Sequence, residues 1–147
     1  SATWWHEEHP LHIRKTSRFT LATRHLERAR DLYVGTIGGT LLHEGENDLL
    51  HTRSAYIAVG RDDVVELVEP LDAGTPVADY VEANHHGLFA VWLQVEELAG
   101  ATGHLASKQV APCLEDASSF LSDPATTHGV HWGVTTNAIP GDTRADW

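Results

Sequence analysis

The chain has 147 residues, 21 acidic and 10 basic, with a formal net charge of −11; this length suits one domain with a buried core, and the charge disfavours a nucleic-acid partner. A single cysteine, Cys113, excludes an intramolecular disulfide, and no apolar run reaches the roughly 18 residues that a membrane span needs. The polar and aromatic N-terminus is unlike a signal peptide, so we expect a cytoplasmic protein with no membrane partner.

The first half of the chain predicts one βαβββ module, residues 17–70. Residues 1–16 lack hydrophobic periodicity and are predicted to form an arm, in which Pro10 excludes a long helix. Alternating apolar and polar residues predict a strand over 18–23, and a helix closed by Gly38-Gly39 follows with the apolar stripe Leu26, Ala29, Tyr33 and Ile37. Three more strands are expected over 40–43, 54–59 and 64–69.

The same order of elements is predicted again in the second half, residues 87–136. A connection rich in Gly, Pro and Asp, residues 70–87, leads to a strand over 88–95 and to a helix with Leu98, Ala101 and Leu105 on one face. Short strands are expected over 109–111, 118–121 and 130–135, followed by a tail, residues 138–147. The predicted fold class is therefore α+β, with one domain over 17–137 built from a duplicated unit.

Several segments resemble the vicinal oxygen chelate superfamily, which includes glyoxalases, bleomycin-resistance proteins and extradiol dioxygenases. The segment from Thr20 to Gly39 resembles the strand, helix and Gly-Gly turn that open a module of that family. Val64-Val-Glu-Leu-Val-Glu-Pro70 resembles the fourth strand, and Phe120-Leu-Ser-Asp-Pro124 with His128-Gly-Val130 resembles the closing hairpin. The resemblance implies two βαβββ modules whose mixed sheet curls into a cup around a small-molecule pocket.

The resemblance also implies where a divalent metal would bind. Family ligands fall on the first and fourth strands of each module, which map to Arg18, Glu66, Ala90 and Gly133. Arginine keeps its proton, and alanine and glycine have no donor atom in the side chain. We therefore predict no metal cofactor, with Glu66 the single competent ligand. A metal-dependent enzyme resembling the extradiol dioxygenases, in which His85, His86 or His131 joins Glu66, is the alternative.

Strand alternation from these positions predicts a set of pocket residues. We predict Glu66 as general base and His131 as its acid/base partner, because a carboxylate and an imidazole can exchange protons with a substrate. The predicted substrate-binding residues are Arg18 for an anionic oxygen, Thr20, Gln94, and Trp92 as an apolar wall. The competing interpretation makes Glu66 and Arg18 a structural ion pair.

Three functions fit this pattern. The first is a metal-independent isomerase, epimerase or lyase that acts by Glu/His proton transfer on a small organic molecule. The second is a non-catalytic drug-binding protein of the bleomycin-resistance type, which five tryptophans and an acidic surface would suit. The third is a non-catalytic half that supports a partner. The bulky apolar pair Trp4-Trp5, which should dock on a partner surface, and the resemblance of the arm and tail to joints between tandem domains predict a homodimer or a second glyoxalase-like domain.

Overall fold

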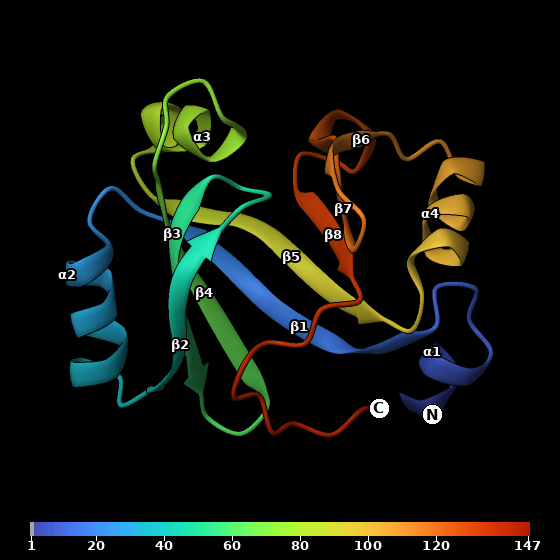
Figure 1. Cartoon of the computed structure of the whole chain (residues 1–147), viewed down its shortest axis with the longest axis horizontal. Helices are drawn as coiled ribbons and strands as arrows, with labels where there is room; N and C mark the ends of the chain where they lie inside the picture. The colour runs from blue at the N-terminus through green and yellow to red at the C-terminus, as the bar shows by residue number, and fades with distance from the viewer. Residues whose placement is uncertain (1) are drawn as a thin grey trace. The chain divides into compact units, whose positions relative to one another are not determined.

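The computed structural model describes residues 2–147, without the side chain of Ala2, and divides the chain into two compact units (Figure 1). Unit 1 contains the chain up to Ser17 together with Ala90–Ala138 and Thr143–Trp147. Unit 2 contains Arg18–Phe89 and Ile139–Asp142. Within residues 2–147, no helix is long and apolar enough to cross a membrane.

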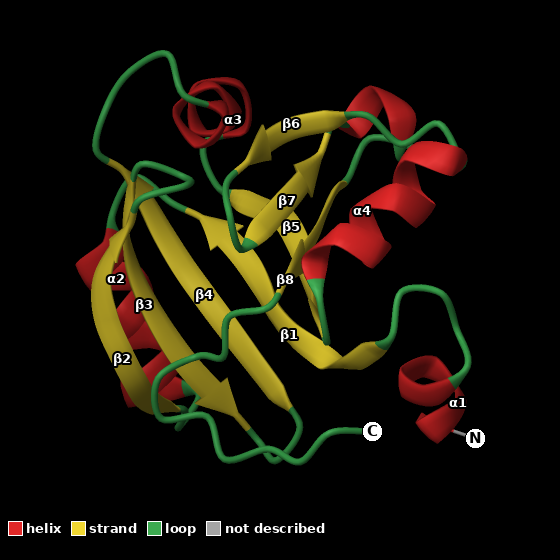
Figure 2. Ribbon diagram, turned by 45° about the vertical axis from the view of Figure 1, so that its right-hand side comes forward, coloured by secondary structure: helices red, strands yellow, loops and turns green. Residues whose placement is uncertain are grey.

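Unit 2 contains the strands and helix of a βαβββ module in the order predicted for the first half of the chain. Its sheet has the order β2-β3-β4-β1, in which β1 pairs with β4 in parallel and the other pairs are antiparallel. Figure 2 shows α2 behind this sheet. The strands are β1 (Ile13–Ala22, of which unit 2 holds the second half), β2 (Thr40–Asn47), β3 (Thr52–Val59) and β4 (Asp63–Pro70), and the helices are α2 (Leu26–Asp31), the π-helix η1 (Leu32–Thr36) and α3 (Pro76–Asn84).

The predicted apolar stripe of the first helix is only partly correct. Leu26 joins Ala55, Ile57 and Leu67 in a buried core cluster, with Ala29 and Tyr33 packed against it, but Ile37 is 51% exposed. The cause is the π-helix, in which Ile37 N–H donates to Leu32 O, five residues earlier, at 2.9 Å. This wider turn breaks the 3.6-residue period and carries Ile37 away from the face that begins at Leu26.

Unit 1 repeats the βαβββ order. Its sheet has the order β5-β8-β7-β6, with β5 and β8 parallel and the other pairs antiparallel. Its core is formed by Ile13, Val95, Ala101, Phe120 and Val134. The elements are α1 (Ala2–Glu7), the first half of β1, β5 (Gly87–Val95, from Ala90 onward), α4 (Leu98–Ser107), β6 (Pro112–Glu115), β7 (Ser119–Ser122), the 3-10 helix η2 (Pro124–Thr126) and β8 (His131–Thr135).

Two elements differ from the sequence prediction. The strand expected over 109–111 is wrong, because Gln109 takes the left-handed conformation (φ 61°) and Val110 N–H returns to Leu105 O, which ends α4; the strand begins at Pro112. The connection 70–87 contains α3, which starts with Thr75 accepting a hydrogen bond from Ala78 N–H and with proline at its first turn. Both are standard signals for a helix start.

The first strand also begins five residues earlier than predicted, at Ile13. Its first half, Ile-Arg-Lys-Thr-Ser, shows no apolar alternation because the C-terminal tail supplies polar partners. Arg144 donates from its guanidinium to the carbonyls of Thr16 (2.9 Å) and Ser17 (2.6 Å), and Trp147 N–H donates to Arg14 O at 2.7 Å. Residues predicted as an arm and as a tail are therefore joined along one strand of unit 1.

The remainder of the arm packs on α4 through aromatic rings. The His9 ring lies 5.1 Å from both Trp4 and Trp5 and 5.8 Å from His104, measured between ring centroids. Its Nδ1 accepts the N–H of Leu11 at 3.2 Å, which requires a neutral imidazole. Burial, His104 and His12 together lower the pKa of His9. Trp4 and Trp5 remain 42% and 41% exposed beside His9, and the docking of this pair on a partner stays a prediction.

The arm is expected to loosen on mild acidification. The folded-state pKa of His9 lies below its ordinary value of 6.5, so the arm contact is complete above pH 6.5 and is lost as the pH falls through the folded-state pKa. A pH titration of tryptophan fluorescence should therefore differ between the wild type and His9→Gln, whose amide oxygen accepts the Leu11 N–H without titrating. Identical titration curves for the two proteins would contradict the assignment of this change to His9.

Candidate functional site

The candidate site in unit 2 is centred on Glu66, which the sheet brings between two other polar residues. Glu66 is the register partner of Thr20 in the parallel pair β1/β4 and of Tyr56 in the antiparallel pair β3/β4. Because partners in neighbouring strands point to the same face, both side chains lie beside the carboxylate. The side chain of Glu66 is fully buried, with 0% exposure.

Four donors surround this carboxylate. Thr20 Oγ1 donates to Oε1 at 2.8 Å, and Arg18 Nε donates to the same oxygen at 3.1 Å, which makes a salt bridge. Asn47 Nδ2 donates to Oε2 at 3.0 Å, and the Tyr56 hydroxyl also hydrogen-bonds to the carboxylate. The Arg18 guanidinium carbon lies 5.6 Å from the Tyr56 ring centroid, a cation–π distance.

The charges of the cluster fix its protonation. Burial opposes ionisation of Glu66, but Arg18 and the hydrogen bonds from Asn47, Thr20 and Tyr56 outweigh it, so the pKa of Glu66 is lowered. Burial and the negative charge of Glu66 raise the pKa of Tyr56 well above its ordinary value. At neutral pH the site therefore holds an ionised carboxylate, a guanidinium cation and a neutral phenol.

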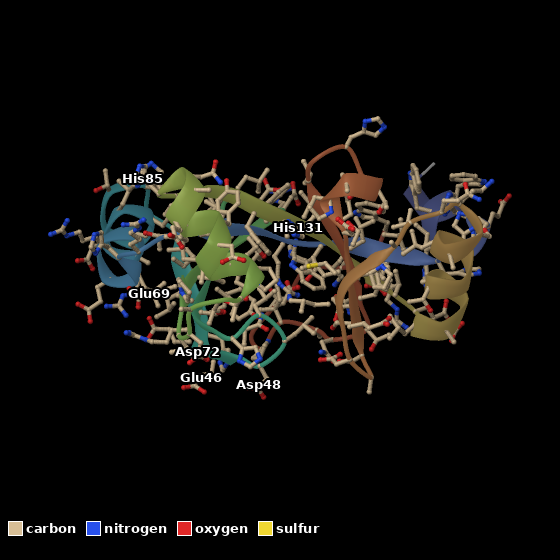
Figure 3. The ribbon with its side chains drawn as sticks, turned by 90° about the horizontal axis from the view of Figure 1, so that it is seen from above. Glu46, Asp48, Glu69, Asp72, His85 and His131 are labelled. Carbon is tan, nitrogen blue, oxygen red and sulfur yellow. The ribbon has the colours of Figure 1, made fainter. Side chains whose placement is uncertain are left out.

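The remaining predicted residues belong to unit 1. Trp92 is fully buried and Gln94 is 7% exposed on β5, while His131 is the first residue of β8 and the register partner of Ala90 (labelled in Figure 3). Trp92 and Gln94 share one face of their strand by alternation. The structure thus brings together Arg18, Thr20 and Glu66 in unit 2, whereas Trp92, Gln94 and His131 lie in unit 1.

Sequence reasoning missed Asn47 and Tyr56. Tyr56 had a usable signal, because counting back through the hairpin of β3 and β4 places it opposite Glu66. Asn47 had none, because its position at the end of β2 depends on how far that strand continues. The observed β2 runs to Asn47, four residues beyond the predicted end at 43.

The family positions do not fit a divalent metal. Arg18 carries a positive charge and pairs with Glu66, and the buried Ala90 has no donor atom. A side chain at Gly133 would collide with the indole ring of Trp92, so the space that a ligand would need there is filled. Within residues 2–147, no group of three or more His, Cys, Asp or Glu side chains is arranged to hold a metal ion.

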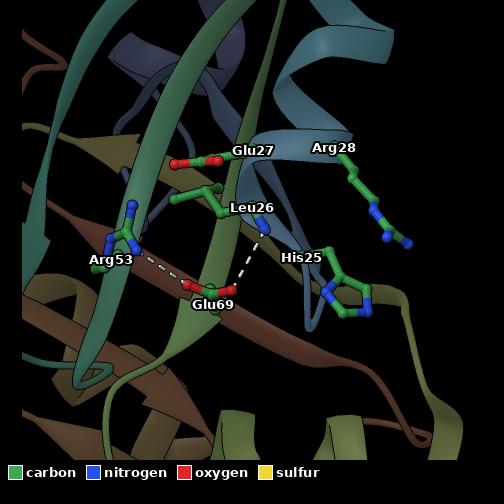
Figure 4. A pocket seen from close by; sticks show the side chains of 6 residues that line it. All are labelled: His25, Leu26, Glu27, Arg28, Arg53 and Glu69. Atoms are coloured by element: carbon green, nitrogen blue, oxygen red, sulfur yellow. Dashed lines mark hydrogen bonds and ion pairs between the residues drawn. The ribbon is translucent and has the colours of Figure 1, made fainter.

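A hollow on unit 2 has a structural explanation. It measures about 200 Å³ and lies at the start of α2, lined by His25, Leu26, Glu27, Arg28, Arg53 and Glu69 (Figure 4). Glu69 accepts the N–H of Leu26 at 3.4 Å and the guanidinium of Arg53 at 3.3 Å. His25, at the N-cap position, makes no side-chain capping bond, so the Glu69 carboxylate satisfies the helix start instead.

Known structures share this fold. Methylmalonyl-CoA epimerase from Mycobacterium tuberculosis matches with a TM-score of 0.77 and 23% identity, over 90% of this chain and 92% of that one. A variant of the Streptomyces coelicolor enzyme, in complex with 2-nitronate-propionyl-CoA, matches with a TM-score of 0.77 and 17% identity, over 86% and 99%. A hypothetical protein from Bacillus halodurans matches with a TM-score of 0.75 and 16% identity, over 88% and 99%. No family model and no curated protein matches.

These matches confirm the predicted fold. The α+β duplication of a βαβββ module is the fold that this chain shares with methylmalonyl-CoA epimerases.

Removing Arg18 should destabilise the protein strongly. Arg18→Met leaves the buried Glu66 carboxylate without its cation, and we expect the free energy of unfolding at pH 7 to fall by about 3–5 kcal/mol in urea titrations. In the wild type, the lowered pKa of Glu66 adds stability above its ordinary value of 4.5, and this is lost on acidification. The variant carboxyl should titrate above that value, so the difference between the proteins should shrink at pH 4. In the double variant Arg18→Met with Glu66→Gln, the free energy of unfolding at pH 7 should recover toward the wild-type value. A difference between the wild type and Arg18→Met that is the same at pH 7 and pH 4 would refute the role of the ion pair.

Divalent metals should not stabilise the folded protein. Because a ligand that binds only the folded state raises the melting temperature, we expect equal melting temperatures with Mn²⁺, Fe²⁺, Zn²⁺ or EDTA. Elemental analysis of the purified protein is the companion measurement. About one ion per chain, with a loss of stability in EDTA, would show that Glu66 acts with histidines such as His85, His86 or His131.

Proposed function

We propose that this protein is a metal-independent isomerase of the glyoxalase-like fold, which moves a proton on the carbon next to a carbonyl group of a small acid or acyl thioester. The observation that carries the proposal is the ionised carboxylate of Glu66, held by Arg18 in a fold shared with epimerases over about nine-tenths of the chain. Another matching epimerase structure contains methylmalonyl-CoA, a thioester with an acidic carbon–hydrogen bond.

The residues have distinct roles in this proposal. Glu66 takes the proton from the carbon, and the electron pair moves to the carbonyl oxygen to form an enolate. Arg18 stabilises that negative oxygen, which is a greater help in a buried site than in water. A proton then returns to the carbon, the role that the sequence prediction assigns to His131, and Glu66 releases its proton to solvent to restore the starting state.

The contacts of Glu66 limit its strength as a base. With four donors and a lowered pKa it is a weak base, so substrate binding must displace at least one donor to raise its basicity. The Arg18 guanidinium stays in place with or without substrate, because this residue is only 7% exposed.

One observation favours a second function. The complete burial of Glu66 and its saturation by Arg18, Thr20 and Asn47 are also what a purely structural ion pair would show. In that case the protein is a non-catalytic small-molecule binder, the second of the functions considered from the sequence. Its negative charge would favour a cationic aromatic ligand over an anionic thioester.

Proton exchange separates the two functions. Methylmalonyl-CoA and a set of shorter acyl thioesters and free 2-substituted acids are incubated with the protein in D₂O, and loss of the hydrogen next to the carbonyl is followed by proton NMR. The isomerase should exchange at least one of them, and Glu66→Gln and His131→Gln should each slow exchange by about 10²–10⁴-fold. His128→Gln, on the exposed loop before β8, is the matched control.

The melting temperature of each variant must be measured beside its rate. A slow but stably folded Glu66→Gln variant supports the catalytic role. Exchange at the wild-type rate in that variant refutes it. Absence of exchange for every compound, with calorimetric binding of an aromatic cation, establishes the binding protein instead.

A further inference from the structure

Unit 1 contains an apolar cavity on the face of its sheet that does not carry the predicted site residues. It measures about 170 Å³ and lies between α4 and the strands β5, β7 and β8. Leu93, Trp132 and Val134 line it, whereas Trp92, Gln94 and His131 are at the alternate positions of the same strands. Side chains of a strand alternate between its two faces, so this cavity is separate from the predicted site.

The sequence of α4 explains why the space is not filled. The helix reads Leu-Ala-Gly-Ala-Thr-Gly-His-Leu-Ala-Ser, and only three of its side chains, Leu98, Ala101 and Leu105, contact the core of the unit. A helix of such small residues underfills the layer above the sheet. The apolar residues around the cavity, among them Leu11, Leu93 and Val110, remain only partly buried as a result.

The two hydroxyl groups of the wall are already engaged. Ser122 Oγ accepts the N–H of Trp132 at 2.8 Å and shares a hydrogen bond with Thr127 Oγ1 at 2.9 Å. Thr127 Oγ1 in turn donates to the carbonyl of Val130 at 2.7 Å. The wall therefore offers a ligand neither a charge nor a spare hydroxyl hydrogen, and it repels water as well as ionic groups.

We infer that this cavity is a second binding site, for a small uncharged hydrocarbon group of about the size of a benzene ring. An apolar cavity of roughly 150 Å³ in another protein stays dry and takes up benzene, which sets the scale. Binding is favourable because the occupant removes its apolar surface from water and makes van der Waals contacts with Leu93, Leu105 and Val110. This site is independent of the isomerase proposal.

Benzene itself is the probe. At ten times its dissociation constant, it should raise the melting temperature of the wild type by roughly 3–6 °C. Benzoate has the same ring with a negative charge and should give no shift. Val110→Phe, which places a ring in the cavity, should abolish the effect of benzene, while Val34→Phe, on the exposed π-helix of unit 2, should leave it intact.

Each outcome decides the matter. Absence of a benzene shift in the wild type, or an equal shift in Val110→Phe, overturns the proposal, and so does equal binding of benzoate. If Val110→Phe does not fold, Leu105→Phe fills the cavity from the helix side and is read in the same way. A melting temperature that rises with protein concentration and no longer responds to benzene would show that a second copy covers the cavity, which also overturns it.

Discussion

The charge of Glu66 constrains unit 2 more than any other group, because a buried carboxylate is tolerated only with its partners in place. Arg18 and Thr20 reach it from β1, Tyr56 from β3 and Asn47 from the end of β2. A one-residue slip of any of these strands would turn a donor to the opposite face. The ion pair therefore fixes strand register in a way that apolar packing of Ile57 and Leu67 alone would not.

The two modules have used equivalent positions differently. In unit 2, the first and fourth strands carry a cation and an anion, Arg18 and Glu66, which neutralise one another. In unit 1, the corresponding positions are Ala90 and Gly133, and the Trp92 ring occupies the space over the glycine. One module has a buried polar centre at these positions, and the other has a bulky aromatic side chain. The isomerase proposal relies on this difference between the modules, because Glu66 is the one carboxylate among the four positions.

The fold was largely predictable from the sequence, because periodicity and turn residues report burial directly. The order of both modules and the helices near Leu26 and Leu98 follow from such patterns, whereas Glu66 was singled out by the resemblance of its strand to a known family. Features that depend on distant partners were not predictable. The start of β1 at Ile13 rests on Arg144 and Trp147, more than 120 residues away, and Asn47 joins the site only through the length of β2. The π-helix at Leu32 has no sequence signal that we recognise.

The joining of Arg144 and Trp147 to β1 also bears on the order in which the chain folds. Unit 1 is discontinuous, and hydrogen bonds that hold its first strand span 127 and 128 residues of sequence. During synthesis, Arg18–Phe89 of unit 2 emerges before its second segment, Ile139–Asp142, and Arg14–Ser17 lacks its tail partners until residues 143–147 have also emerged. Contacts of such long sequence separation form slowly, so this edge of β1 is open to other strands for most of translation. The basic side chains of Arg14 and Lys15 protect an edge in that state, since charge discourages pairing between chains.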